Sequence, residues 1–526
     1  MIEQKEQNRR LVRSTLAVSA PTFLSRIFGF IRDLIQAYYM GTGRGMDAFT
    51  IAYTIPNLLR RLTGEGAMTA AFVPIFTQQK KEKTKEELWK FAHFFFFDLT
   101  LIMALITVLG IIFSPLLVRI ISVGFKDIAG KWDLTIVLTR IMFPYIFLIS
   151  LAALAMAILN SFHKFFVPAF TPVLFNLSII TLAVIFAARA EEPSYVFAAG
   201  VVVGGVFQLA FQLPFLWRQG MHFKPMLSFR HPAVRKVGKL MVPGIFGAGL
   251  YQINFAISRM IASLLEEGSV SSLYYAARIQ ELTLGLFSIA LSIALLPTFS
   301  DLAASQDIEG MKKTLVYAFR LIFMVTFPAM VGLLILNRPI IQVLFQRGEF
   351  NEQSTAMSAS CLFFFALGIP FISGVRIMAP AFYSLKDIKT PVIVASFVMV
   401  VYISLSFLLM NPLQVGGIAL ALSLASVFNF VVLFYLLERK IGRVKKKKII
   451  TAALKSALAA AGMGLLVWSF IRHVDMDRLV FVQKLGVLAS AIIIGIAGYI
   501  LLSLIFGHRD LKSLKDVFSR EKILKK

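Results

Sequence analysis

Residues 25–33 read SRIFGFIRD and place charged side chains inside a segment that is otherwise apolar enough to cross a bilayer. The next apolar segment, residues 46–78, is charged too, and together the two carry Arg26, Arg32, Asp33, Asp47, Arg60, Arg61 and Glu65. An ionisable group in hydrocarbon costs about 2.5 to 3.5 kcal/mol on insertion scales, so such groups usually face a protein interior or a wet cavity. We therefore expect these two helices to form the wall of a polar cavity inside a membrane protein.

The composition is that of an integral membrane protein. Of the 526 residues, 58% are hydrophobic and only 16% are charged, far from the balance of a soluble globular protein. The net charge of +26 comes from basic residues in short gaps between apolar runs, as the positive-inside rule describes, so it requires no nucleic acid partner. The single Cys361 excludes an intramolecular disulfide and a metal site built on cysteines.

Apolar runs long enough to span a bilayer predict an all-α polytopic protein with fourteen membrane helices. The expected ranges are 14–40, 46–78, 88–118, 133–161, 168–188, 194–217, 236–264, 269–302, 311–337, 353–385, 389–411, 415–438, 449–473 and 480–506. The first run follows basic residues as in a signal peptide, but it continues to Arg26, so we expect an uncleaved helix. Basic gaps alternate with neutral or acidic ones, which predicts that both termini are cytoplasmic.

The first six helices resemble the next six. Pro74 and Pro297 are 223 residues apart, and Pro168 and Pro391 are separated by the same number. Because six is even, the two copies share one orientation, which predicts two lobes related by a pseudo-two-fold axis along the membrane normal. We expect an N-terminal lobe at residues 1–220, a C-terminal lobe at 221–440, and an appended helix pair with a cytoplasmic tail at 441–526.

The positions of the charges suggest an anionic ligand. Arg26 and Arg60 lie near the middle of their helices, where snorkelling to the interface does not explain them. Further charges in later helices are Arg140, Arg259, Arg278, Glu281 and Arg376. Arginine binds phosphate or carboxylate bidentately, so several arginines around one cavity suit a pyrophosphate-bearing lipid. Intramembrane ion pairs that only fix helix register are the structural alternative.

No motif indicates catalysis or a bound cofactor. The sequence contains no phosphate-binding loop, no histidine-rich run and no aspartate-rich run, and its six histidines include four at or near predicted cytoplasmic gaps. An intramembrane transferase would place carboxylates or histidines at an interface beside a long loop, whereas this chain places arginines at mid-depth. We therefore expect a transporter rather than an enzyme.

Several motifs resemble the MurJ (MviN) family of lipid II flippases. They are SRIFGFIRD at 25–33, DAF at 47–49, IPNLLRRL at 55–62, AFVP at 71–74, YYAAR at 274–278, LLP at 295–297 and AFYSLKDIKTP at 381–391. The resemblance implies two six-helix lobes, a C-terminal helix pair that forms a groove for the lipid tail, and alternating access. It also implies that lipid II, the undecaprenyl-pyrophosphate-linked MurNAc-pentapeptide-GlcNAc, is turned from the inner to the outer leaflet of the bacterial cytoplasmic membrane.

The resemblance also assigns residues. The arginines important in the family correspond to Arg26, Arg32, Arg60 and Arg278, with Asp33, Asp47, Arg61 and Glu65 as charged neighbours. Some relatives have an aspartate where this chain has Ala277, and Glu281 is a potential substitute. Some relatives bind sodium, for which only Asn254 and Asn429 are candidates here, so the coupling ion, Na+ or H+, or the membrane potential stays open. Membrane lipids and the cell-wall synthesis machinery are the further partners we expect. A flippase for another polyprenyl-linked oligosaccharide and a multidrug antiporter remain the alternative transporters.

Overall fold

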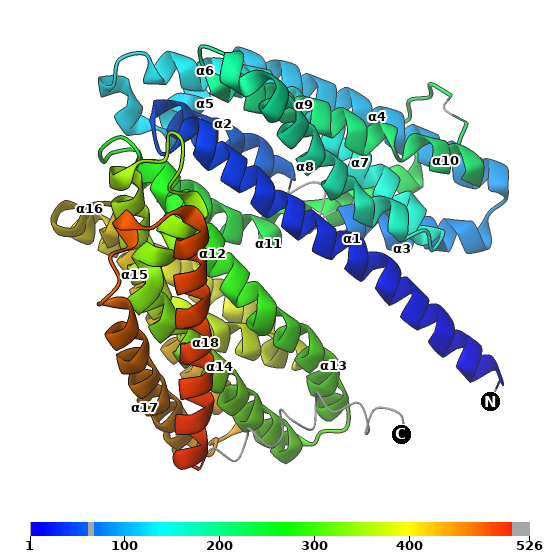
Figure 1. The fold of residues 1–526 in the computed structure, drawn as a ribbon. Coiled ribbons are helices and arrows are strands. Elements are labelled where there is room, and N and C mark those ends of the chain that lie inside the picture. Colours follow the sequence, from blue (N-terminus) through cyan, green and yellow to red (C-terminus); the bar gives the residue numbers. More distant parts are fainter. Residues whose placement is uncertain (1, 61–67, 223, 508–526) are drawn as a thin grey trace. The chain divides into compact units, whose positions relative to one another are not determined.

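A computed structural model describes residues 2–60, 68–222 and 224–507, and every regular element in these residues is a helix (Figure 1). Each of the fourteen predicted ranges coincides with helical structure. Within the described residues, ten helical segments are long and apolar enough to cross a membrane. The all-helical, multi-pass prediction is therefore confirmed.

Contacts along the chain define two compact units, which we describe separately. The first comprises Met1–Ser271 with Arg347–Asn351, and the second comprises Ser272–Gln346 with Glu352–Lys526. The predicted lobe boundaries at residues 220 and 440 stay predictions.

Most of the predicted helices in the first unit are interrupted at a proline. The helices are α1 Ile2–Met40, α2 Arg44–Arg60, α3 Thr69–Glu82, α4 Lys85–Ile112, α5 Ser114–Ile121, α6 Lys131–Met142, α7 Pro144–Ser161, α8 Phe166–Phe186, α9 Pro193–Ala210, α10 Leu213–Gln219 and α11 Pro232–Ala262. Pro115, Pro144 and Pro214 each stand at the start of a new helix, where the missing N–H costs nothing. The predicted ranges 88–118, 133–161 and 194–217 are consequently helix pairs.

The second unit contains longer helices. They are α12 Ser269–Leu284, a π-helical turn at Gly285–Ile289, α13 Ala290–Ala304, α14 Ile308–Phe345, α15 Glu352–Ser384, α16 Lys389–Ile441, α17 Lys446–Ile471 and α18 Phe481–Ile505. The two helices predicted at 389–411 and 415–438 both fall within α16, which is broken at Gln414 by a φ of 49° and a ψ of −137°. This break, two residues after Pro412, separates the two predicted spans.

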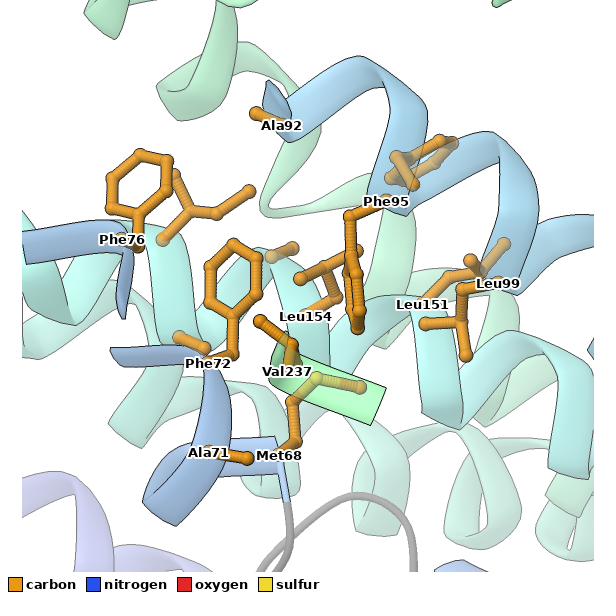
Figure 2. Packing of buried hydrophobic residues seen from close by; sticks show 14 of the residues in the cluster. Met68, Ala71, Phe72, Phe76, Ala92, Phe95, Leu99, Leu151, Leu154 and Val237 are labelled. Atoms are coloured by element: carbon orange, nitrogen blue, oxygen red, sulfur yellow. The ribbon is translucent and has the colours of Figure 1, made fainter. Parts of the chain in front are cut away.

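An aromatic cluster forms the core of the first unit. Phe72 of α3 stacks on Phe76, with ring centroids 5.2 Å apart, and on Phe91 of α4 at 5.7 Å. Figure 2 shows Phe72 between Phe76 and Phe95, with Val237 of α11 against the same cluster. Aromatic pairs of this kind add to the free energy gained by burying apolar area. The cluster thus joins α3, α4 and α11 into one body.

The second unit has a comparable core on α14. Phe319 stacks on Phe323 at 5.8 Å and meets Phe430 of α16 edge-on at 5.7 Å. On the other side of α14, the Tyr499 hydroxyl of α18 donates to the Met324 carbonyl at 2.6 Å. The predicted C-terminal helices, α17 and α18, lie side by side in Figure 1 and pack on α14.

The helix ends repeat with the offset that the prolines predict. α4 begins at Lys85 and α14 at Ile308, α8 is followed 223 residues later by the α16 region, and α7 and α15 end at Ser161 and Ser384. The caps correspond as well, because the Thr84 and Asp307 side chains each accept a backbone N–H three residues ahead. Two non-glycine residues with positive φ, His163 and Lys386, are also 223 residues apart. The internal repeat is thus present in the backbone, not only in the sequence.

Candidate functional site

Arg26 lies in the middle of α1, a helix of 39 residues, and its side chain is exposed. Among the described residues it makes no hydrogen bond or ion pair. An arginine at this depth keeps all five N–H donors available for a ligand. This is the feature of the first unit that most clearly matches the predicted anion site.

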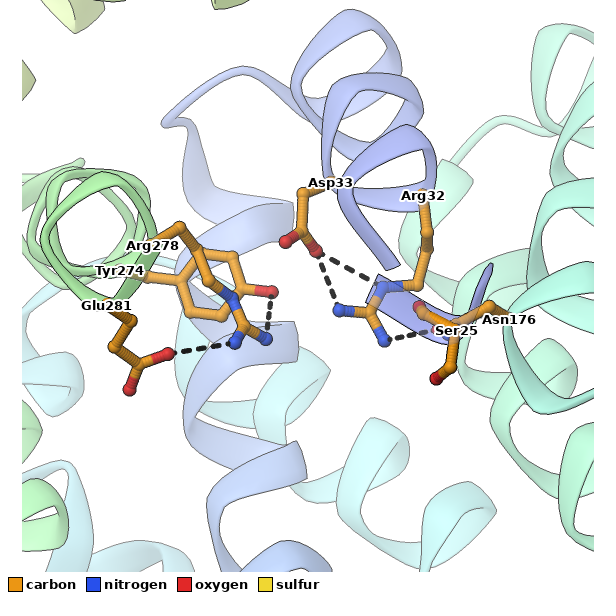
Figure 3. A network of polar contacts seen from close by, with 7 residues as sticks. All are labelled: Ser25, Arg32, Asp33, Asn176, Tyr274, Arg278 and Glu281. Carbon is orange, nitrogen blue, oxygen red and sulfur yellow. Dashed lines mark hydrogen bonds and ion pairs between the residues drawn. The ribbon is translucent and has the colours of Figure 1, made fainter. Parts of the chain in front are cut away.

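Arg32, two turns further along α1, is held in place by other side chains. Its Nη2 donates to Asp33 Oδ1 at 2.7 Å, and its Nη1 donates to Asn176 Oδ1 at 3.0 Å (Figure 3). Asn176 of α8 in turn donates through Nδ2 to the Ser25 carbonyl at 3.1 Å. The side chains of Arg32 and Asp33 are only 12% and 4% exposed. The network therefore fixes the orientation of one guanidinium one to two turns from the unpartnered Arg26.

The charges of the second predicted helix are only partly described. Arg60, the last residue of α2, donates through Nε and Nη2 to Asn57 Oδ1 at 3.2 and 3.1 Å. Arg61 and Glu65 lie outside the described residues, so the predicted pairing of these two side chains stays a prediction.

The second unit holds a separate arginine group on α12. Arg278 Nη1 donates to Glu281 Oε2 at 3.2 Å, and Nη2 donates to the Tyr274 hydroxyl at 3.1 Å (Figure 3). The guanidinium carbon also lies 4.9 Å from the centroid of the Tyr274 ring. Both charged side chains are partly exposed, at 33% and 41%. Glu281 thus takes the role of a carboxylate partner, as its position in the sequence suggested.

Arg376 resembles Arg26 in having no partner. It lies in α15, is half-buried, and its side chain makes no hydrogen bond or ion pair with a described residue. Its backbone carbonyl accepts the Ser292 hydroxyl of α13 at 2.8 Å, which fastens the two helices together at this level. Arg376 therefore remains available to an anion.

Asp47 has a different environment from the arginines. Its Oδ2 accepts from Lys131 Nζ at 2.7 Å and from the Gly268 N–H at 2.9 Å, and its Oδ1 accepts from the Ser271 N–H at 2.8 Å and hydroxyl at 2.6 Å. The Asp47 and Lys131 side chains are each 1% exposed. Lys131 Nζ also lies 4.3 Å from the centroid of the Phe125 ring. The carboxylate thus has four donors from the protein itself, and contact of Asp47 with substrate stays a prediction.

The other charged residues named from the sequence have local partners. Arg259 Nη1 donates to the Thr54 hydroxyl at 2.6 Å, and Arg140 Nε donates to the Ser114 hydroxyl at 3.0 Å. Asn254 in the first unit and Asn429 in the second each have a buried Oδ1 without a hydrogen-bond partner. In the part of the chain that the structure describes, no group of three or more His, Cys, Asp or Glu side chains could hold a metal ion.

Sequence reasoning did not identify three residues that organise these groups, namely Asn176, Lys131 and Tyr274. Asn176 is 5% exposed in the middle of an otherwise apolar helix, and that contrast is a signal which the sequence does contain. Lys131 is at the start of α6, where a lysine normally snorkels toward water, so nothing in the sequence shows that it is buried. Tyr274 matches a family motif, but its contact with Arg278 depends on the helical spacing of four residues.

The fold and these arginines define a class of protein. A multi-pass helical bundle built from an internal repeat, with arginines at mid-helix and no catalytic constellation among the described residues, is a membrane transporter for an anionic substrate. Solved transporter structures have the same fold. One is an inward-facing multidrug resistance MATE family transporter of the MOP superfamily, with a TM-score of 0.66 at 15% identity over 82% of this chain and 99% of the other.

Closer relatives identify the family within this class. The family model for the lipid II flippase MurJ matches residues 36–517. A probable lipid II flippase MurJ of Vibrio cholerae is 34% identical over 97% of this chain and 98% of the relative, and one of Rhizobium tropici is 34% identical over 97% of both. A solved lipid II flippase MurJ in an inward closed conformation aligns with a TM-score of 0.78 at 28% identity, covering 94% of this chain and 99% of that one. The chain belongs to the MurJ family of lipid II flippases.

Proposed function

We propose that this protein moves lipid II from the inner to the outer leaflet of the bacterial cytoplasmic membrane by alternating access between its two lobes. The observation that carries the proposal is the pair of mid-helix arginines on α1, Arg26 without a partner and Arg32 held by Asp33 and Asn176. The diphosphate of lipid II is the part of the substrate that cannot cross hydrocarbon unaided. Arginine side chains in a cavity wall compensate its charge through bidentate hydrogen bonds.

The two arginines have complementary roles in this proposal. A guanidinium that is already oriented loses little conformational freedom when it binds a phosphate, so Arg32 supplies a preorganised contact. The unpartnered Arg26 supplies donors that are not shared with any carboxylate of the described residues. Arg278 and Arg376, in the second unit, are the residues through which we propose that the C-terminal lobe contacts the headgroup. Arg60, Arg61 and Glu65 complete the set proposed from the sequence.

We also propose an orientation, with both termini and the basic gaps in the cytoplasm. Cysteines introduced at Gly43 and Glu191 should react with an impermeant thiol reagent added outside intact cells, whereas one at Lys446 should not. The buried Cys361 is first replaced by serine to remove the background. Labelling at Lys446 in intact cells would contradict the orientation without affecting the assignment of substrate.

The energy source is a separate question for which the side chains supply candidates only. Asn254 and Asn429 have unpartnered carbonyl oxygens of the kind that Na+ accepts, whereas H+ or the membrane potential would need neither side chain. Contact with the cell-wall synthesis machinery belongs to the proposal as well.

Depletion of the protein in its host tests the function directly. We expect lipid II to accumulate in the inner leaflet, and a plasmid-borne copy with intact Arg26 and Arg32 to restore its appearance outside. Unchanged peptidoglycan synthesis after depletion, in a host without a second flippase, would overturn the proposal. Export of a different polyprenyl-linked oligosaccharide, with lipid II unaffected, would instead favour the alternative flippase function.

A further inference from the structure

An open cavity of about 560 Å³ lies in the first unit, away from the mid-helix arginines. Its lining includes Leu116 and Arg119 of α5, Lys126 and Gly130 of the following loop, and Trp132 and Asp133 of α6. The cavity is therefore bordered by the end of one apolar helix pair and the start of the next. No residue of the family motifs lies in this lining.

The position of the cavity corresponds to a membrane–water boundary. α4 is an apolar span that ends at Ile112, and the span formed by α6 and α7 begins at Lys131. Between them, α5 exposes the large apolar side chains of Phe113, Leu116 and Ile120, each more than half exposed. Exposed apolar groups beside cations and a tryptophan are typical of the interfacial zone of a bilayer. One side of the cavity thus faces lipid tails and the other faces headgroups.

The charges in the cavity are suited to an anion. Arg119 makes no hydrogen bond or ion pair with a described residue, and the only contact of the Lys126 ammonium is with the Trp132 ring, 5.6 Å from its centroid. Asp133 is the one acidic side chain in the lining. Two cations against one carboxylate give the lining a net positive charge. Gly130 adds no side chain, and a Cβ there would meet only Arg44 Nη1, at 3.4 Å.

The cavity wall is fixed by buried contacts rather than formed by a loose loop. Phe125, in the loop before α6, is 1% exposed and lies beneath Lys131. Gly124 fits so closely that a Cβ would lie 2.0 Å from the Ser263 carbonyl oxygen. Lys131 is itself held by Asp47 at 2.7 Å. A ligand therefore enters a preformed site and orders little of the protein on binding.

We propose that this cavity is a binding site for the phosphate headgroup of an anionic phospholipid, such as phosphatidylglycerol, whose acyl chains lie along α5. The phosphodiester interacts with Arg119 and Lys126, and the chains contact the apolar face of the helix. The proposal depends on neither the substrate nor the transport mechanism. It concerns a lipid that remains in one leaflet beside the protein.

Trp132 is a built-in reporter for this lipid. The chain has four tryptophans, so replacing Trp89, Trp217 and Trp468 by phenylalanine leaves Trp132 as the single fluorophore. The variant is reconstituted in phosphatidylcholine nanodiscs that contain a small fraction of a lipid brominated near the top of its acyl chains. In one arm that lipid is phosphatidylglycerol, and in the other it is phosphatidylcholine. We expect quenching of Trp132 to reach half its maximum at a roughly tenfold lower fraction of brominated phosphatidylglycerol.

Charge variants link this preference to the cavity. Arg119→Ala with Lys126→Ala should make the two quenching curves coincide, while Asp133→Asn should increase the preference for phosphatidylglycerol. Arg189→Ala removes an exposed cation from another predicted outer gap and should change nothing. Because Asp133→Asn predicts a gain, the test survives a double variant that fails to fold.

Three results would overturn the proposal. One is equal quenching by the two brominated lipids in the parent variant. Another is a preference that persists in the correctly folded double variant. The third is full relief of quenching by millimolar glycerol phosphate in the buffer, since the site would then bind a soluble phosphate rather than an anchored lipid.

Discussion

Asp47 and Arg26 lie in consecutive helices, and each is a charge in a segment that would otherwise suit hydrocarbon, yet their surroundings are opposite. Asp47 is 1% exposed and accepts four hydrogen bonds, one of them from Lys131. Arg26 is exposed and makes no polar contact with a described residue. A charge neutralised inside the protein holds helices together, whereas a charge without a partner is available to a ligand. The two regions should therefore respond differently to mutation, one in stability and the other in transport.

The largest effect on stability should come from Lys131→Met, which removes the counterion of a buried carboxylate. Loss of one member of a buried ion pair costs about 3 to 5 kcal/mol in free energy of unfolding. Unfolding in detergent, followed by circular dichroism, measures the change. A second change, Asp47→Asn, should recover part of the loss because it removes the uncompensated charge.

Arg44→Ala is the matched control for this ion pair. Arg44 Nη2 lies 3.3 Å from Glu192 Oε2, but the two side chains are 48% and 20% exposed. An exposed pair of this kind contributes about 0 to 1 kcal/mol. If Lys131→Met and Arg44→Ala destabilise the protein equally, the Asp47 network is not the structural element that we infer.

The complementary prediction concerns Arg26→Ala, which should abolish lipid II flipping and leave the free energy of unfolding within about 0.5 kcal/mol of the parent. The side chain has no protein partner to lose, so its removal affects only the ligand. Arg26→Lys should restore only part of the activity, because an ammonium cannot reproduce the bidentate fork. Accessibility of the lipid II headgroup outside the cell measures flipping.

Arg13→Ala, near the start of α1, provides the control for a charge that the sequence places close to the helix end. Flipping should remain close to that of the parent. Normal flipping by Arg26→Ala would exclude Arg26 as an essential ligand and would return it to the class of structural charges.

Sequence reasoning reached the fold because its signals are local. Apolar runs, basic gaps and prolines 223 residues apart each act over one helix or one loop, and the ends of α4 and α14 follow that spacing. Helix interruptions at Pro115, Pro144 and Pro214 were not predicted, because a hydropathy window averages over them. Arg32, Arg278 and Glu281 were recognised from charge in an apolar context.

The partners of these charges could not be read from the sequence. Asn176 and Ser271 are 144 and 224 residues from the side chains they contact, and no helical period connects such positions. A lysine at a helix start looks solvated, so the burial of Lys131 becomes visible only once α2 and α6 are packed together. Charge identity was thus predictable, whereas charge neutralisation was not.

Asn176→Ala should have an intermediate effect that falls between the two regions. It removes the acceptor of Arg32 Nη1 and the donor to the Ser25 carbonyl, at a cost of about 1 to 2 kcal/mol in free energy of unfolding. Flipping should decrease, but less than in Arg32→Ala, because the guanidinium stays present and loses only one of its fixed orientations. Ser178→Ala, on the same helix, removes a hydroxyl that bonds only its own helix backbone and should be neutral. A flipping rate unchanged in Asn176→Ala would show that orientation of Arg32 does not matter.

The smallest effect should come from Asp387, a saturated charge like Asp47 but one that lies in the loop between α15 and α16. Its carboxylate accepts from Lys440 Nζ at 2.5 Å and from the Thr390 N–H and hydroxyl at 3.0 and 2.7 Å. The hydrogen bond from Lys440, followed by the Thr390 N–H, lowers the pKa of Asp387 to about 2. An unfolded aspartate has a pKa of about 3.9, so the folded protein holds the ionised form more strongly than the unfolded chain does.

The sign of the pH dependence follows from this difference. Because the folded-state pKa is the lower one, the carboxylate stabilises the fold fully above about pH 4, and its contribution disappears as the pH falls toward 2. Asp387→Asn should cost on the order of 1 kcal/mol at neutral pH, since Lys440 is partly exposed and water screens the pair. The gap between parent and variant should stay constant from pH 8 to about pH 5 and close below pH 4, as measured by chemical unfolding in detergent. Glu309→Gln is the control, because its pair with Lys312 is fully open to solvent and should give no gap at any pH. A gap for Asp387→Asn that persisted down to pH 2 would mean that packing of the loop, rather than the ionised carboxylate, provides its stability.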